Sequence, residues 1–115
     1  MSIKRLHPGQ RMSQAVIHGD TVYLAGQVGS PGQSVTEQTQ QILDQIDNLL
    51  AESGSSRAGL LSATIWLSDI GYFDEMNAVW DSWIGGRNAP VRATSEAKLS
   101  NPDLHVEVII IAALD

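Results

Sequence analysis

The chain has 115 residues, of which 43% are apolar and 17% charged, and these proportions are typical of an ordinary folded domain. Seven Lys and Arg against thirteen Asp and Glu give a net charge of -6, which disfavours binding to nucleic-acid backbones and to anionic membranes. Because the chain has no cysteine, disulfides, thiol nucleophiles and thiolate metal sites are excluded.

The chain shows no targeting or membrane-spanning pattern. Its first residues lack the apolar run of a signal peptide, and the most apolar segment, residues 106–114, contains Glu107 and is too short to cross a bilayer. We therefore expect one domain over residues 1–115, located in the cytoplasm, with no membrane and no nucleic acid among its partners.

The N-terminal part contains two β-prone segments around a Gly-Asp pair. Gly19 and Asp20 interrupt an otherwise apolar and β-branched stretch over residues 16–24, and glycine readily takes the positive φ of a two-residue turn. This pattern predicts a β-hairpin, and residues 3–6 are a candidate for a short extra strand.

A first helix is predicted over residues 35–53. Ser34 and Glu37 have the Ser-x-x-Glu spacing of a capping box, which satisfies free amides at a helix start. Apolar side chains then recur every three or four residues, which is the period of one helix face. They are Ile42, Leu43, Ile46, Leu49 and Leu50. Gly54 follows as the residue that ends the helix.

A strand and a second helix come next. Residues 61–67 alternate apolar and polar side chains, as in a strand with one buried face, and Trp66 falls on the other face. A second helical stripe over residues 70–84 follows Asp69, a candidate N-cap, and stops at two glycines.

Two further strands are predicted at residues 91–99 and 105–112, separated by a turn that contains Asn and Pro. The order is then strand, strand, helix, strand, helix, strand, strand. Two helices can cover only one face of such a sheet, so we expect an α+β two-layer sandwich of a mixed sheet with both helices on one face. The other face requires cover, for which a second copy of the chain is the obvious source.

The usual signatures of metal and nucleotide chemistry are missing. The three histidines, at positions 7, 18 and 105, are scattered without a metal-ligand spacing, and no phosphate loop or nucleophile elbow is present. We expect no metal and no cofactor. The three tryptophans are interpreted as packing residues, because almost no basic residues lie between them to form a base-stacking platform.

Arg92 and Glu107 are the residues best placed for chemistry. Pro90 favours an extended start, so Arg92 is expected at the beginning of a strand and at a sheet edge, where a pocket can open. Glu107 interrupts an apolar strand, and a buried carboxylate requires a partner. Two interpretations remain open: the two residues neutralise each other, or Arg92 binds a substrate carboxylate while Glu107 acts as an acid or base.

The C-terminal segment resembles the signature of the Rid family of reactive intermediate deaminases, also called YjgF-like proteins. The matching residues are Ala89-Pro90-Val91-Arg92, Lys98 and Val106-Glu107, and the resemblance extends upstream through residues 25–28, 62–69 and 73–77. It therefore covers nearly the whole chain, and the short length is similar to that of a compact bacterial branch of the family.

This resemblance implies a chorismate-mutase-like fold and a homotrimer in which the sheets form a central β-barrel, with pockets at the subunit interfaces. By position, it implies that Arg92 binds the substrate carboxylate and that Glu107 activates water. It also implies that the backbone of Ala25 and Gly26 contacts the ligand. Asn77 and Thr94 match positions near the pocket.

The implied activity is hydrolytic deamination of small enamines and imines, of the 2-aminoacrylate and 2-iminobutyrate type, to 2-oxo acids and ammonia. Met12 and Ala25 stand where the family often has tyrosine and a hydroxyl residue. These differences favour an alternative, a non-catalytic module that binds a small carboxylate metabolite at the trimer interface. Nucleic-acid cleavage, attached to some family members, is disfavoured by the net charge of -6.

Overall fold

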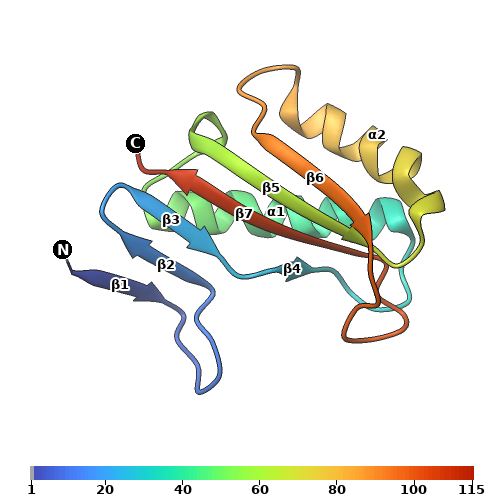
Figure 1. The fold of residues 1–115 in the computed structure, drawn as a ribbon, viewed down its shortest axis with the longest axis horizontal. Helices are drawn as coiled ribbons and strands as arrows, with labels where there is room; N and C mark the ends of the chain where they lie inside the picture. Colours follow the sequence, from blue (N-terminus) through green and yellow to red (C-terminus); the bar gives the residue numbers. More distant parts are fainter. Residues whose placement is uncertain (1) are drawn as a thin grey trace.

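A computed structural model describes residues 2–115 as one mixed sheet with two helices. The strands are β1 (Ile3–Leu6), β2 (Ala15–His18), β3 (Thr21–Leu24), β4 (Gln27–Val28), β5 (Leu60–Leu67), β6 (Val91–Glu96) and β7 (Val106–Ala113). Their order in the sheet is β1-β2-β3-β7-β5-β6, and β4 pairs with β7 beside β3 (Figure 1). All neighbouring strands are antiparallel except β5 and β6, which are parallel.

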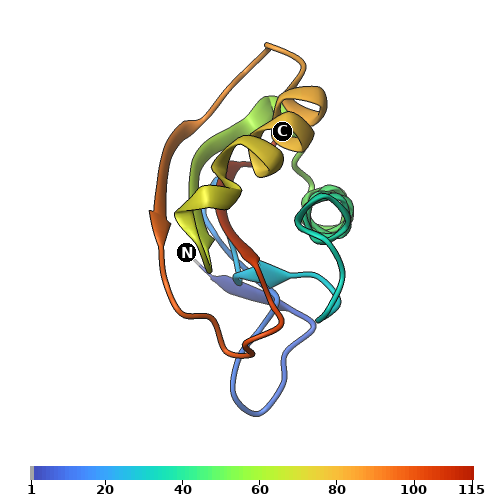
Figure 2. The ribbon, with the colours of Figure 1, turned by 90° about the vertical axis from the view of Figure 1, so that its right-hand side faces the viewer.

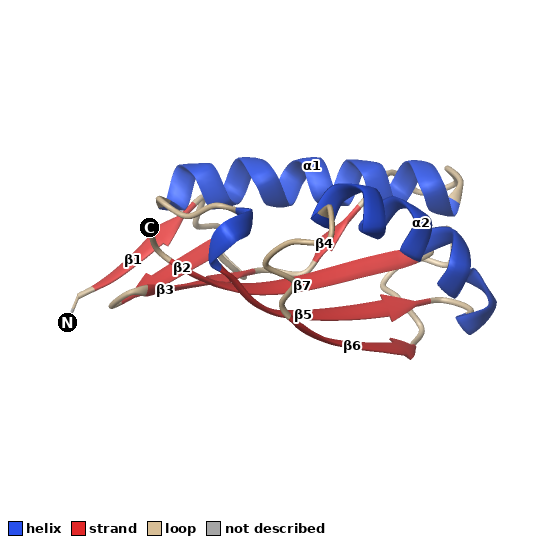
Figure 3. Ribbon diagram, turned by 90° about the horizontal axis from the view of Figure 1, so that it is seen from above, coloured by secondary structure: helices blue, strands red, loops and turns tan. Residues whose placement is uncertain are grey.

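The helices α1 (Val35–Ser53) and α2 (Phe73–Ile84) lie on the same face of the sheet (Figure 3). Seen edge-on in Figure 2, the sheet forms one layer and the helices the other. The predicted α+β architecture, a mixed sheet with both helices on one face, is therefore confirmed. No helix within residues 2–115 is long and apolar enough to cross a membrane.

The N-terminal hairpin forms as predicted. Strands β2 and β3 pair around Gly19 and Asp20, and Gly19 has a φ of 62°, in the left-handed region that glycine enters without steric cost. The short strand β1 pairs with β2, which places it at one edge of the sheet.

Helix α1 has the predicted boundaries. The Ser34 side chain accepts a hydrogen bond from the Glu37 amide, and Gly54 ends the helix in the left-handed conformation. The apolar stripe is buried against the sheet, with Ile42 and Ile46 fully inaccessible. Gln38 is also buried; its side-chain amide donates to the carbonyls of Gln33 and Asp103 and accepts the His105 amide. These bonds tie the start of α1 to the turn before β7.

The second helical segment is shorter than the pattern predicts. Residues Ile70–Tyr72 form a separate turn of 3₁₀ helix, and α2 begins only at Phe73. Asp69 is an N-cap, as expected, but it caps the 3₁₀ turn and not α2, because its carboxylate accepts a hydrogen bond from the Gly71 amide. Tyr72 precedes α2 and supplies no side-chain cap.

The last strands also differ at their ends. The strand predicted over residues 91–99 stops at Glu96, because the amide of Ala97 turns to the carbonyl of Leu67 and the chain leaves the sheet. The final strand runs over Val106–Ala113, one residue later than predicted. The short strand β4 was not predicted, because two residues beside glycines carry no period.

Alternation along β7 defines the two faces of the sheet. Val106, Val108, Ile110 and Ala112 are buried beneath the helices, and the residues between them are only partly covered. On this second face, which we call the open face, Trp66 and Tyr23 pair in register with residues of β7 and are 36% and 46% exposed. No element of residues 2–115 packs over the open face (Figure 3), and its apolar side chains are the surface for which the sequence predicts a partner.

Candidate functional site

Arg92 lies near the start of the edge strand β6, as the sequence predicts. It is the register partner of the buried residue Ala63 in β5, so its side chain points to the helix face of the sheet. There its Nη1 donates a hydrogen bond of 2.8 Å to the Asn77 side chain on α2. The guanidinium carbon lies 5.4 Å from the ring centre of Trp80 and 5.7 Å from that of Phe73. One face of α2 therefore fixes the position of Arg92.

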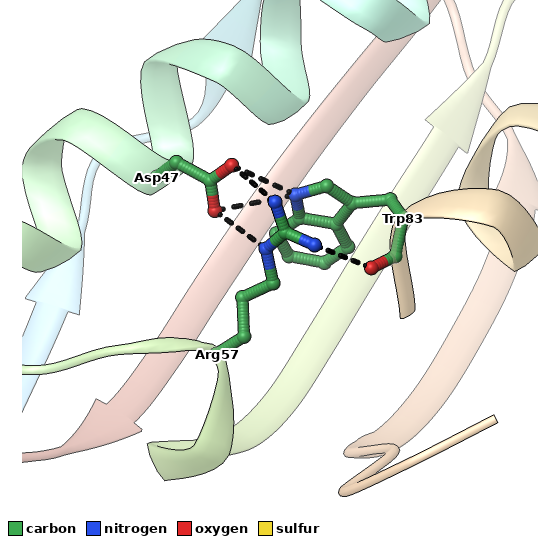
Figure 4. A network of polar contacts seen from close by, with 3 residues as sticks. All are labelled: Asp47, Arg57 and Trp83. Atoms are coloured by element: carbon green, nitrogen blue, oxygen red, sulfur yellow. Dashed lines mark hydrogen bonds and ion pairs between the residues drawn. The ribbon is translucent and has the colours of Figure 1, made fainter. Parts of the chain in front are cut away.

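Helix α2 is in turn held to α1 by a polar cluster of Asp47, Arg57 and Trp83 (Figure 4). The Arg57 guanidinium donates to both Asp47 oxygens, at 2.9 and 2.8 Å, and to the Trp83 carbonyl at 2.6 Å. The Trp83 indole also donates to Asp47, and its ring centre lies 5.3 Å from that of Trp80. This cluster joins the end of α2 to α1, and the two indole rings continue it toward the residues around Arg92.

A cleft of about 320 Å³ opens between α2 and the start of β6. Two of the residues expected at the site line it, Arg92 and Asn77, together with four that the sequence patterns do not single out as site residues. These are Trp80, Asp81, Ala89 and Pro90. Trp80 was interpreted as a packing residue, and it is indeed 5% exposed within the core. Asp81 was missed because helical periodicity identifies the face of a helix that packs on the core, not residues beside a cleft.

Thr94, two residues after Arg92 on the same strand, points to the same face of the sheet. Its hydroxyl oxygen is inaccessible to solvent and has no hydrogen-bond partner within residues 2–115. Unpaired buried hydroxyls are uncommon and cost free energy. The chain therefore keeps an unsatisfied polar atom on the same strand and face as the Arg92 guanidinium.

Glu107 lies on the opposite face. It pairs in register with Trp66 of β5 and with Val28 of β4, and it faces the open side of β7. Partial burial among apolar neighbours raises the pKa of its carboxyl above the ordinary value. Gly26 contacts the same carboxylate so closely that a Cβ atom at this position would overlap it. The sequence-predicted residues Glu107 and Gly26 are thus together.

The turn that carries Ala25 and Gly26 is anchored by neighbouring polar groups. The Ala25 amide donates to the Gln14 carbonyl. The Ala25 carbonyl accepts the side chain of Gln27, a buried glutamine that also bonds Gln14. Gln27 was not identified as a site residue, and only its place inside the matching segment of residues 25–28 could have signalled it. Met12, in the loop before β2, is 51% exposed and lies outside the hydrogen-bonded turn.

The structure thus divides the predicted site into two parts. Arg92, Asn77 and Thr94 lie on the helix face, and Glu107 and Gly26 lie on the open face of the same sheet. Residues 2–115 contain no ion pair between Arg92 and Glu107, and opposite faces preclude one. The interpretation that these two residues neutralise each other within one chain is therefore wrong.

No metal centre is formed by the part of the chain that the structure describes, since no three His, Asp or Glu side chains gather there. The chemistry that the two parts can support is that of a guanidinium, a carboxylate of raised pKa and backbone groups at a turn. Such groups can bind an anion and move a proton.

The fold and these residues define a class of small α+β proteins with a six-strand path, two helices on one face and an arginine at the edge strand. A family model described as Endoribonuclease L-PSP matches residues 2–114. A RutC family protein of Haemophilus influenzae is 42% identical over 114 residues, covering 97% of this chain and 98% of its own. The chain belongs to the YjgF/Rid family.

Solved structures agree with this assignment. A YjgF family member from Neisseria meningitidis has a TM-score of 0.97 at 41% identity, covering 100% of this chain and 97% of its own. A protein from Salmonella typhimurium described as a putative translation initiation inhibitor has a TM-score of 0.89 at 41% identity, covering 98% of both chains. The names given to relatives therefore include different activities for one fold.

Proposed function

We propose that this protein is a hydrolytic deaminase that converts small enamine and imine intermediates of the 2-aminoacrylate and 2-iminobutyrate type into 2-oxo acids and ammonia. The observation that carries the proposal is the state of Arg92. Its guanidinium donates one hydrogen bond, to Asn77, and has no carboxylate partner within residues 2–115. An arginine in a cleft with free donors is suited to a ligand carboxylate, which it binds through two parallel hydrogen bonds.

The reaction itself needs few groups. An enamine first tautomerises to the imine; water then adds to the imine carbon, a proton moves to nitrogen, and ammonia leaves as the carbonyl forms. Glu107 is the proposed proton carrier, because burial raises its pKa toward neutral pH. A general acid or base is most effective when its pKa lies near the pH at which it works. Binding and orientation of the imine supply the rest of the rate gain. Neither a metal nor a cofactor takes part.

The division of the site between two faces supports a shared active site. Because Arg92 and Glu107 of one chain point away from each other, a single ligand meets both only when they come from different chains. We propose a homotrimer in which the open faces form a central barrel and the sites lie between subunits. Trp66, Tyr23 and Val91 on the open face, the last of these 73% exposed, supply the apolar surface for this assembly.

A non-catalytic binding module for a small carboxylate metabolite is the second candidate. It is favoured by Met12 and Ala25, which stand where the family often has tyrosine and a hydroxyl residue. Such a module uses the same cleft and the same arginine, so it differs from the deaminase only in turnover. The Endoribonuclease description of the family model points to nucleic acid, but a net charge of -6 disfavours that substrate.

The test is ammonia release from freshly generated 2-aminoacrylate and 2-iminobutyrate, compared with the spontaneous rate. Arg92→Ala is expected to abolish the enzymatic increment and the binding of 2-oxobutyrate, and Arg92→Lys to restore little, because an ammonium lacks the planar fork. Glu107→Gln is expected to keep binding and lose at least about a hundredfold in rate. Arg92-dependent binding without wild-type turnover establishes the binding module instead.

Sedimentation at micromolar protein concentration tests the assembly. A trimeric mass for the wild type and for Arg92→Ala supports the shared site. A monomeric mass for the wild type would remove the means of bringing Arg92 and Glu107 to one ligand, and the deaminase proposal would fail with it.

A further inference from the structure

The cleft beside Arg92 carries two opposite charges that do not pair. Asp81 and Arg92 both line it, yet no ion pair joins them within residues 2–115, where Arg57 with Asp47 and His7 with Glu52 are the pairs formed. The Asp81 side chain takes part in no hydrogen bond in the described chain, and its backbone carbonyl accepts the Gly85 amide at the end of α2. Its carboxylate is therefore available to a ligand.

The helix sets the arrangement of these groups. Asn77 and Asp81 are four residues apart on α2, so they lie on the same side of the helix, one turn from each other. Asn77 holds the Arg92 guanidinium at 2.8 Å. The guanidinium is thereby placed at one turn of α2 and the Asp81 carboxylate at the next, with Trp80 also in the wall of the cleft.

Two unpaired opposite charges in one cleft suit a ligand that carries both a negatively and a positively charged group. A small molecule can bridge the two residues if its carboxylate binds Arg92 and its nitrogen binds Asp81. Each of these two hydrogen bonds is about 2.9 Å long, and a short carbon link joins the carboxylate to the nitrogen. A cleft of about 320 Å³ has room for a molecule of a few heavy atoms. A ligand with a carboxylate alone satisfies Arg92 but brings a second negative charge toward Asp81.

We propose that Asp81 makes the cleft selective for 2-substituted acids with a positively charged nitrogen, so that the imine is bound as its protonated iminium form. This inference rests on the proposed function, because it takes Arg92 as the carboxylate-binding residue. Protonation of the C=N nitrogen makes its carbon more electrophilic and hence more open to attack by water. The 2-oxo acid product lacks the charged nitrogen, so Asp81 also weakens product binding.

Calorimetric titration with two stable probes that differ only at carbon 2 tests the proposal: 2-aminobutyrate, which carries an ammonium, and 2-oxobutyrate, which carries a carbonyl. The wild type is expected to bind 2-aminobutyrate about fivefold more tightly, the upper range for a solvent-accessible charge pair. Asp81→Asn is expected to remove this preference by weakening 2-aminobutyrate alone. The variant keeps the size of the side chain and places no new group on the core face of α2.

Asp20→Asn is the matched control. Asp20 lies in the turn between β2 and β3, far from the cleft along the chain, and the substitution removes the same charge. It is expected to leave the preference unchanged, which separates a local effect of Asp81 from the change in net charge.

The outcomes distinguish this inference from the proposed function. If 2-oxobutyrate binds and Arg92→Ala abolishes its binding, but both probes bind equally to wild type and Asp81→Asn, the role of Asp81 is refuted and the carboxylate site stands. If Arg92→Ala has no effect on either probe, both proposals fail. With 2-iminobutyrate as substrate, Asp81→Asn is expected to raise KM about fivefold, whereas a merely structural role would lower the melting temperature without changing probe preference.

Discussion

Gly26 lies against the carboxylate of Glu107, and a Cβ atom at residue 26 would overlap its Oε2 atom. The two residues come from segments that pair in the sheet, since Val28 of β4 is the register partner of Glu107. The absence of a side chain lets the turn and the carboxylate lie in contact. A ligand that reaches Glu107 therefore also meets the backbone of the turn.

Replacing Gly26 with alanine is expected to displace Glu107 and to lower the deamination rate at least about tenfold, since small misplacements of a catalytic group are costly. Overpacking should also reduce the unfolding free energy by about 1–3 kcal/mol. Ammonia release and denaturant unfolding measure the two effects. Gly9→Ala, where the added Cβ meets only the Met12 carbonyl at 3.4 Å, is the control, and equal behaviour of both variants would contradict the contact.

The pKa of Glu107 predicts how stability varies with pH. Burial raises this pKa in the folded chain above the ordinary value of 4.5. When the pH lies between these two values, the Glu107 carboxyl is protonated in the folded state and ionised in the unfolded state. Stability therefore falls as pH rises through the interval between the unfolded and folded pKa values. Glu107→Gln removes this dependence. The melting temperature of the variant minus that of the wild type should therefore be larger at pH 7 than at pH 4.

The alternation of buried and exposed residues along α1 gives a direct test of the core. Leu43 and Ile46 are buried under the sheet, and Asp44 between them is exposed. Leu43→Asp or Ile46→Asp places a carboxylate in the core at a cost of several kcal/mol, comparable to a total stability of about 5–15 kcal/mol, so neither variant should fold. Asp44→Ala should melt within a few degrees of the wild type. Circular dichroism during heating decides between these outcomes.

The polar cluster of Asp47, Arg57 and Trp83 is expected to stabilise the end of α2. Arg57→Ala removes three hydrogen bonds from a partly exposed guanidinium, for which a loss of about 1–2 kcal/mol in unfolding free energy is expected. Arg87→Ala, an exposed arginine with no side-chain hydrogen bond in the described chain, should lose less than about 0.5 kcal/mol. Equal losses would show that the cluster contributes nothing.

The sequence predicts the periodic elements well and the irregular ones poorly. Helix α1 was predicted to the residue because Ser34 and Gly54 mark its ends and an apolar stripe fills the interval. The strand from Val91 was extended to residue 99, since nothing in its composition shows that the Ala97 amide turns toward Leu67. Two-residue strands such as β4 have too few side chains to display a period.

The candidate site shows a similar limit. Arg92 and Glu107 were both identified from chemistry, one at an edge and one inside an apolar strand. Their placement on opposite faces depends on which residues of β5 they face, Ala63 and Trp66 respectively. Ala63 and Trp66 are an odd number of residues apart on β5, so their side chains lie on opposite faces of the sheet. Which residues of β5 face Arg92 and Glu107 depends on the strand register, which no local pattern of side chains reveals.

The central strand β7 comes last among the strands in chain order. It pairs with β3, β4 and β5, and β5 in turn carries β6. Until residues 106–113 leave the ribosome, the N-terminal hairpin and the β5–β6 pair have no strand to join them, and their apolar faces stay exposed. The sheet therefore cannot close before residues 106–113 have been translated, and until then the unpaired strand edges and apolar faces favour aggregation.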